Sequence, residues 1–228
     1  IDSAMQAGVD RNLGHDYLVD IDARYEESAR VTSPTPWDII NELMQGGLGG
    51  GELGVVVAPA GIGKSWVLSA MGAYAISQGL NIVHYTLELN EAYVGLRYDS
   101  IFSGVESQNL KYHKEEVMEK LFKLKGNLTI KYYPTKSCTV NTLSAHLKKV
   151  TTFGKKVDMV LVDYADIMRD VHKSSEMRHA LGNIYEDLRG LAGELQVPIW
   201  TASQANRSAL DEDVIEATKV AESYAKVM

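Results

Sequence analysis

A glycine-rich segment between two apolar runs constrains the fold of this chain more than any other feature. It reads Ala58-Pro59-Ala60-Gly61-Ile62-Gly63-Lys64-Ser65, and Trp66 follows it. The segment matches the phosphate-binding pattern G-x-x-x-x-G-K-[ST] except at the first position, where Ala58 replaces glycine. A strand-like run precedes it at residues 53–57, and a helix-like run follows it at residues 66–71. This is the context that such a loop requires, so a nucleotide-binding protein is predicted.

Each residue type in this loop has a chemical role in holding phosphate. Gly61 and Gly63 allow the tight turn in which successive backbone N–H groups point at the phosphates. The helix that begins near Lys64 adds the positive end of its dipole. The Lys64 ammonium can reach the β- and γ-phosphates, and the Ser65 hydroxyl can bind the magnesium ion that bridges them. Residues 58–66 are therefore expected to bind ATP together with Mg²⁺.

Strand-like and helix-like runs alternate along the rest of the chain. Strands are expected at residues 53–57, 81–87, 128–132, 159–162 and 199–202, and helices at 37–44, 64–78, 91–102, 115–125, 139–152 and 177–195. This alternation predicts an α/β fold with a mostly parallel, twisted sheet flanked by helices, and with the ligand at the carboxyl ends of the strands. Residues 1–33 are expected to be a linker or extension in which Tyr17, Leu18, Ile21 and Tyr25 are spaced like one face of a short helix.

The composition argues against several other classes of protein. The 228 residues include one cysteine, Cys138, so an internal disulfide framework and a cysteine-rich zinc site are excluded, and a small buried or half-buried side chain is expected there. No apolar run approaches membrane-spanning length, and the first residues lack the character of a signal peptide. A cytoplasmic protein without membrane contact is expected. The formal net charge of −7 restricts any contact with nucleic acid to a few loops.

Three further strand ends carry a polar residue after an apolar run. Asp163 follows residues 159–162 and fits the second nucleotide motif, in which the carboxylate holds magnesium; the alternative is a solvated acid at a strand end. Glu88 is the candidate general base for hydrolysis, or else an acidic residue at the start of a helix. Gln204 is expected to donate a hydrogen bond to the γ-phosphate, unless it only forms a turn in the loop that residues 203–207 begin.

Three cations lie in loops near these strand ends. Arg169, Lys173 and Arg207 are candidate contacts to DNA or to a neighbouring subunit, although isolated loop cations are more often only solvated. The six histidines show no metal-ligand spacing, so no metal site is assigned to them.

These segments also resemble a known family. Gly46-Gly47-Leu48, Gly51-Glu52-Leu53, Thr86-Leu87-Glu88, Val162-Asp163-Tyr164 and Ser203-Gln204-Ala205-Asn206-Arg207 are similar to the RecA-like motor domain of DnaB-type hexameric replicative helicases. The likeness is greatest to the helicases of T-even-type bacteriophages. It extends to Asp16-Tyr17, Arg24-Tyr25, Tyr133-Pro134-Thr135, Glu186-Asp187-Leu188-Arg189 and Trp200-Thr201-Ala202, and thus spans nearly the whole chain.

The resemblance implies a RecA-like P-loop ATPase that assembles into a ring hexamer and moves along single-stranded or forked DNA. It implies that Lys64 and Ser65 are the phosphate-loop residues, Glu88 the catalytic glutamate, Asp163 the magnesium-site aspartate and Gln204 the γ-phosphate sensor. Primase and a helicase loader are the implied partners, in the host cytoplasm if the protein is encoded by a phage. Residues 34–228 would be the motor domain, truncated before the segment that carries the arginine finger.

Two other functions remain open on the sequence alone. A RecA-type recombinase has a similar fold and would also hydrolyse ATP on DNA, but it would form helical filaments and exchange strands. A nucleotide-gated DNA-binding scaffold would bind ATP and partners without hydrolysing it, and ATP turnover that disappears in Glu88→Gln would exclude it.

Overall fold

The computed structural model describes residues 14–27, 31–172, 174 and 176–205. Contacts between Cα atoms divide the chain into two compact units, residues 1–31 and residues 32–228. Within the first unit, helix α1 covers Ile21–Glu27. Ile21 and Tyr25 belong to this helix, but Tyr17 and Leu18 lie in the preceding turn, where the Asp16 carboxylate accepts the N–H groups of Leu18 and Val19. The expected single helical face is therefore wrong for Tyr17 and Leu18, because Asp16 stabilises a turn there.

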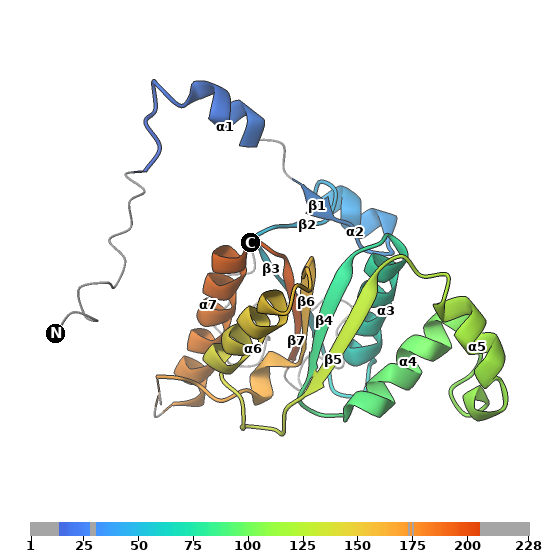
Figure 1. Cartoon of the computed structure of the whole chain (residues 1–228). Helices are drawn as coiled ribbons and strands as arrows, with labels where there is room; N and C mark the ends of the chain where they lie inside the picture. The colour runs from blue at the N-terminus through green and yellow to red at the C-terminus, as the bar shows by residue number, and fades with distance from the viewer. Residues whose placement is uncertain (1–13, 28–30, 173, 175, 206–228) are drawn as a thin grey trace. The chain divides into compact units, whose positions relative to one another are not determined.

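The second unit alternates strands and helices, as the sequence predicts (Figure 1). Its strands are β1 (Thr32–Ser33), β2 (Leu48–Gly49), β3 (Leu53–Ala58), β4 (Asn81–Thr86), β5 (Asn127–Tyr132), β6 (Met159–Asp163) and β7 (Ile199–Gln204). Its α-helices are α2 (Asp38–Leu43), α3 (Lys64–Ser77), α4 (Glu91–Ser103), α5 (Lys114–Leu121), α6 (Val140–Thr152) and α7 (Met177–Leu195). Two 3₁₀ helices are η1 (Leu110–Tyr112) and η2 (Ala165–Ile167).

The main sheet has five parallel strands in the order β3-β7-β6-β4-β5. Strand β6 is buried at all five positions, as its continuous apolar run predicts for a strand that is covered on both faces. β1 and β2 form a separate antiparallel pair that the sequence analysis does not predict. The expected mostly parallel sheet flanked by helices is confirmed.

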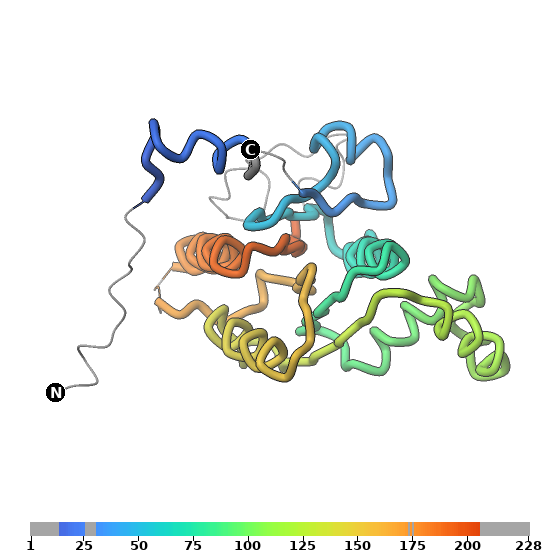
Figure 2. The backbone as a smooth tube through the Cα atoms, turned by 45° about the horizontal axis from the view of Figure 1, so that its top comes forward, coloured from blue at the N-terminus to red at the C-terminus, as the bar shows by residue number. Residues whose placement is uncertain are grey.

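Helices cover both faces of the sheet, and two apolar clusters form the core. One cluster joins α6 and α7 to the face of β4 and β6 that carries Tyr85 and Val162. The other joins α3 and α4 to the opposite face, which carries Ile82 and Leu161. In Figure 2 the helices α6 and α7, in yellow and orange, lie on one side of the strands and α3, in green, lies on the other. This three-layer arrangement leaves the carboxyl ends of the strands free to carry a ligand site.

Local interactions explain where several elements begin and end. The Asn90 side chain caps α4 by accepting the N–H of Tyr93 at 3.0 Å, and Thr139 caps α6 together with Thr142 in a capping box. Helix α5 ends earlier than the expected residue 125. The chain turns after Phe122, and the N–H of Gly126 then donates to the carbonyl oxygen of Ile76 in α3.

Strand β7 is longer than expected because Ser203 and Gln204 belong to it and not to the following loop. They pair in register with Val57 and Ala58 of β3. The prediction that a loop begins at Ser203 is therefore wrong by two residues. The difference matters because Gln204 is a candidate site residue, and it is held by regular sheet pairing beside the start of the phosphate loop.

Candidate nucleotide site

The phosphate loop joins the end of β3 to the start of α3. Gly61 and Gly63 have φ angles of +78° and +102°, in the left-handed region that favours glycine, so the sequence chooses these residues for their backbone conformation. Gly63 is the N-cap of α3, and the first turn of this helix contains no acidic residue. The positive end of the helix dipole is thus not neutralised by a neighbouring carboxylate of its own turn. This geometry suits an anionic ligand.

The Lys64 side chain folds back over the loop. Its Nζ donates to the carbonyl oxygens of Ala58 at 3.1 Å and Pro59 at 3.0 Å. Burial lowers the pKa of Lys64, while the negative charges of Asp166, Glu88 and Asp163 act in the opposite direction. The ammonium therefore lies in the field of three carboxylates that come from different parts of the chain, and it is available to a phosphate placed on the loop.

Ser65 and Asp163 meet, although 98 residues separate them in sequence. The Ser65 Oγ donates to the Asp163 Oδ1 at 3.0 Å. Burial raises the pKa of Asp163, and the hydrogen bond from Ser65 and the charges of Arg97 and Lys64 oppose this effect. One hydroxyl and one carboxylate side by side fit the way proteins bind Mg²⁺, which keeps several waters and takes its other oxygens from substrate phosphates. Within the described part of the chain, no cluster of three or more His, Cys, Asp or Glu side chains offers an all-protein metal site.

Glu88 and Gln204 come from the strands on either side of β6 and from the same edge of the sheet. Glu88 follows β4 and is exposed; the preceding N–H, of Leu87, donates to the carbonyl oxygen of Asp163 at 2.8 Å. The negative charge of Glu88 contributes to raising the pKa of Asp163. Gln204 is the partner of Ala58 in the β3–β7 pair. The structure thus brings the phosphate loop, Glu88, Asp163 and Gln204 to one edge, while their individual roles stay predictions.

The sequence analysis misses two charged residues of this region. Asp166 in η2 accepts the backbone N–H of Gln204 at 2.8 Å and acts on the charge of Lys64. Arg97 in α4 stacks over the Trp66 ring at 5.4 Å and acts on the charge of Asp163. One of its terminal nitrogens is buried and has no hydrogen-bond partner among the described residues. An acid three residues after Asp163 and a cation beside the apolar Tyr98 are the only sequence signals for them.

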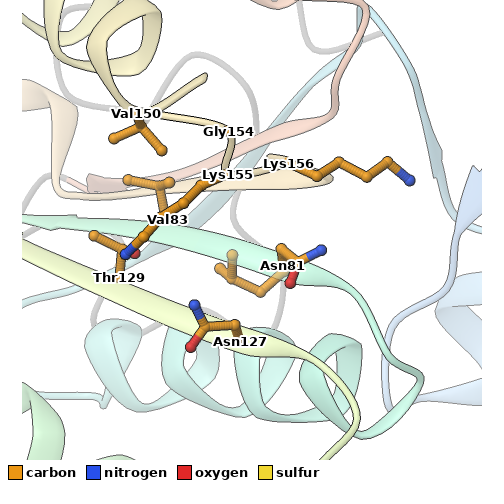
Figure 3. A pocket seen from close by; sticks show the side chains of 9 residues that line it. Asn81, Val83, Asn127, Thr129, Val150, Gly154, Lys155 and Lys156 are labelled. Atoms are coloured by element: carbon orange, nitrogen blue, oxygen red, sulfur yellow. The ribbon is translucent and has the colours of Figure 1, made fainter. Parts of the chain in front are cut away.

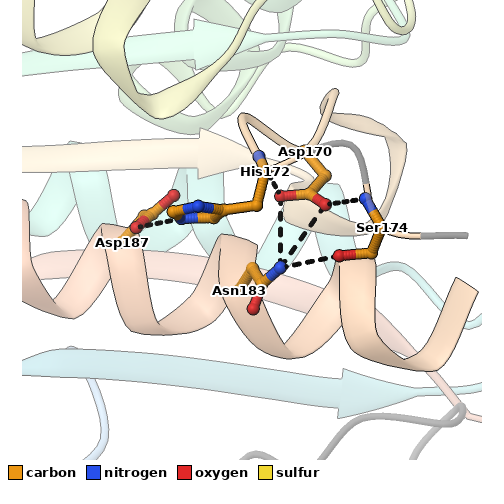
Figure 4. Close-up of polar contacts among 5 residues, drawn as sticks. All are labelled: Asp170, His172, Ser174, Asn183 and Asp187. Carbon is orange, nitrogen blue, oxygen red and sulfur yellow. Dashed lines mark hydrogen bonds and ion pairs between the residues drawn. The ribbon is translucent and has the colours of Figure 1, made fainter. Parts of the chain in front are cut away.

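Of the three loop cations, the structure places only Arg169. Its side chain is exposed, and its N–H donates to the carbonyl oxygen of Cys138. Lys173 and Arg207 lie outside the described residues. The loop after Arg169 is fastened to α7 by Asp170, which accepts the N–H groups of His172 and Ser174, both at 2.9 Å, as Figure 4 shows.

Cys138 is buried, as expected, and burial raises the pKa of its thiol to about 11. A pocket of about 220 Å³ lies away from the site, at the amino ends of β4 and β5 (Figure 3). Residues that line it include Asn81, Asn127, Lys155 and Lys156. Because the phosphate loop is at the carboxyl ends of the strands, this pocket is separate from the candidate nucleotide site. No helix in the described ranges is long and apolar enough to cross a membrane.

The chain is similar in sequence to a family of known proteins. A family model described as the DnaB-like helicase C-terminal domain matches residues 34–214. The DnaB-like replicative helicase of Enterobacteria phage T4 is 27% identical over 238 residues, which cover 96% of this chain and 49% of that protein. The replicative DNA helicase DnaB of Helicobacter pylori is 23% identical over 172 residues, which cover 73% of this chain and 35% of that protein. The chain thus spans half or less of the length of these two curated relatives.

Two solved structures share the fold. One is a DnaB-like replicative helicase studied for its interactions with primase, with a TM-score of 0.77, 14% identity, and coverage of 97% of this chain and 56% of that one. The other is a separately solved ATPase domain, with a TM-score of 0.74, 16% identity, and coverage of 92% of this chain and 79% of that one. The RecA-like fold and the family expected from the sequence are confirmed.

Proposed function

Because the chain belongs to the DnaB-like helicase C-terminal domain family, we propose that it binds Mg-ATP at the phosphate loop and couples ATP hydrolysis to movement along single-stranded DNA and to unwinding of the duplex. The hydrogen bond between Ser65 and Asp163 carries this proposal. It joins the phosphate loop to the end of β6, as a shared magnesium site between a loop hydroxyl and a strand-end carboxylate requires.

Each strand end has a part in the proposed reaction. Lys64 stabilises the charge that develops on the transferred phosphoryl group, because its ammonium is within the loop that holds the phosphates. Ser65 and Asp163 hold Mg²⁺, which neutralises phosphate charge when bound. Glu88 orients the attacking water and accepts its proton. The Gln204 side chain donates a hydrogen bond to the γ-phosphate and so distinguishes ATP from ADP.

The proposed assembly is a ring hexamer in which residues 34–228 are the motor domain and residues 1–33 a linker. A ring presents several copies of one modest basic loop to a central strand, and this copy number compensates for a net charge of −7. Arg169, Lys173 and Arg207 are the proposed DNA or subunit contacts. Primase is a proposed partner, supported by the structural relative that was studied with it, and a helicase loader is another.

The first test of this function separates ATP binding from turnover with Glu88→Gln. The amide keeps the shape of the side chain but cannot accept a proton, so the full-length protein should bind Mg-ATP as before and lose DNA-stimulated hydrolysis and fork unwinding. Equal loss of affinity and rate would assign Glu88 to the metal or to the structure of the site. Wild-type protein that binds ATP but never hydrolyses it, with or without DNA, would support the scaffold function instead.

A further inference from the structure

The Asp166 carboxylate joins β7 to α7, and the proposed reaction does not use it. Its Oδ2 accepts the backbone N–H of Gln204 at 2.8 Å and the Ser203 hydroxyl at 3.1 Å. Its Oδ1 accepts the Tyr185 hydroxyl at 2.5 Å. The side chains of Ser203 and Tyr185 are buried. Hydrogen bonds to a charged acceptor are stronger than neutral ones, so three of them from buried or backbone donors hold this carboxylate, and hence the end of β7, in one arrangement.

The backbone that Asp166 holds is also fastened to the phosphate loop. The N–H of Ala205 donates to the carbonyl oxygen of Ala58 at 3.1 Å. The Lys64 ammonium donates to the same carbonyl oxygen, also at 3.1 Å. A shift of Gln204 therefore changes the carbonyl oxygen to which Lys64 binds, and the direction of the Gln204 side chain depends on the hydrogen bond from its own N–H to Asp166.

We propose that Asp166 is a positioning residue that directs the Gln204 side chain toward the γ-phosphate and thereby sets the preference of the site for ATP over ADP. The inference rests on the proposed function, since it requires a nucleotide on the phosphate loop. Asp166 acts through Gln204 and touches no phosphate itself. Its negative charge also acts on Lys64, so the test must separate the position of Gln204 from the charge.

The test measures dissociation constants for Mg-ADP and for a non-hydrolysable Mg-ATP analogue by calorimetry in the full-length protein. We expect Asp166→Ala to bind ADP within about twofold of wild type but to lose about tenfold in its preference for the ATP analogue, the effect of one hydrogen bond to a charged phosphate. Gln204→Ala should lose the same preference. If Asp166 acts only through Gln204, the double variant should be no worse than Gln204→Ala alone.

Two variants separate this role from alternatives. Asp166→Asn keeps a carbonyl oxygen for the N–H of Gln204 but removes the charge, so it should retain most of the ATP preference. Asp158→Ala is the matched control, because this carboxylate also accepts a strand backbone N–H, that of Asn81 at 2.9 Å, but at the opposite edge of the sheet. It should lower stability without changing the ATP preference, because a general loss of stability affects both nucleotides equally.

The outcomes are distinguishable from failure of the proposed function. If Lys64→Ala still binds both nucleotides like wild type, the phosphate loop itself is misassigned and the inference falls with it. If Lys64→Ala loses binding but the effects of Asp166→Ala and Gln204→Ala add, Asp166 does not act through Gln204 and only the present inference is overturned. Equal losses in Asp166→Asn and Asp166→Ala would also overturn it, because they would assign the effect to charge.

Discussion

At the scale of single residues, the contact between Ser65 and Asp163 predicts how nucleotide binding depends on magnesium. Ser65→Ala removes a metal ligand and the donor that holds Asp163 Oδ1. We expect the affinity for Mg-ATP to fall about tenfold, while affinity measured in excess chelator stays unchanged. Calorimetric titrations with and without Mg²⁺ make this measurement.

Ser69→Ala is the matched control for this prediction. Its hydroxyl, one turn along α3, donates to the carbonyl oxygen of Ser65 at 2.9 Å and does not reach Asp163. It should lower stability without altering the response to magnesium. Equal responses to magnesium in the two variants would contradict the assignment of Ser65 as a ligand.

Another residue-scale prediction concerns the buried His84. Burial, with a smaller contribution from the positive charge of Arg97, lowers its pKa to about 3, and its Nδ1 lies 2.8 Å from the Tyr98 hydroxyl. In the unfolded chain the imidazole has a pKa near 6.5, so the unfolded state binds the extra proton between these values. Stability from neutral His84 is therefore fully present above pH 6.5 and is lost as the pH falls toward 3, by up to about 1.4 kcal/mol per pH unit.

The measurement compares free energies of unfolding in urea for wild type and His84→Gln between pH 7 and pH 4.5. His84→Gln should be less stable at pH 7 and should show a shallower loss of stability on acidification, because it has no group to protonate at this position. Parallel pH profiles for the two proteins would show that His84 is not the group that titrates.

At the scale of elements, the capping box of α6 predicts a stability effect that leaves the nucleotide site unchanged. Thr139→Ala removes the acceptor of the Thr142 N–H and should cost about 1 kcal/mol, measured by urea unfolding. Thr152→Ala, at the exposed last position of the same helix, should change stability by less than about 0.5 kcal/mol. Similar costs for both would mean that the cap does not fix the start of α6.

Elements and loop were predictable from the sequence because their signals are local. The order of strands and helices follows from apolar runs and breakers, and the phosphate loop from eight consecutive residues. The end of β7 was not predictable, because Gln204 is held there by Ala58 and Asp166, which are far away in sequence. For the same reason Asp166 itself was not predicted: an acid in a turn after a strand looks solvated until its three donors are seen together.

At the scale of the whole molecule, the topology explains why one edge of the sheet can carry the chemistry. Strands β3, β7, β6 and β4 are neighbours and parallel, so four strand ends that are distant in sequence open onto the same edge. The opposite edge holds the pocket with Lys155 and Lys156, where no phosphate loop is present. The account therefore requires that nucleotide binding depend on a lysine at the carboxyl edge and not on one at the amino edge.

The most direct test measures the binding of a non-hydrolysable ATP analogue with Mg²⁺, and the turnover of ATP, in Lys64→Ala and in Lys155→Ala. Thermal unfolding should show that both variants fold. Lys64→Ala should lose at least tenfold in affinity and about a hundredfold or more in turnover, because the cation that faces the phosphates is gone, while Lys155→Ala should match wild type. Wild-type binding and turnover in folded Lys64→Ala would contradict the central claim that this loop is the nucleotide site.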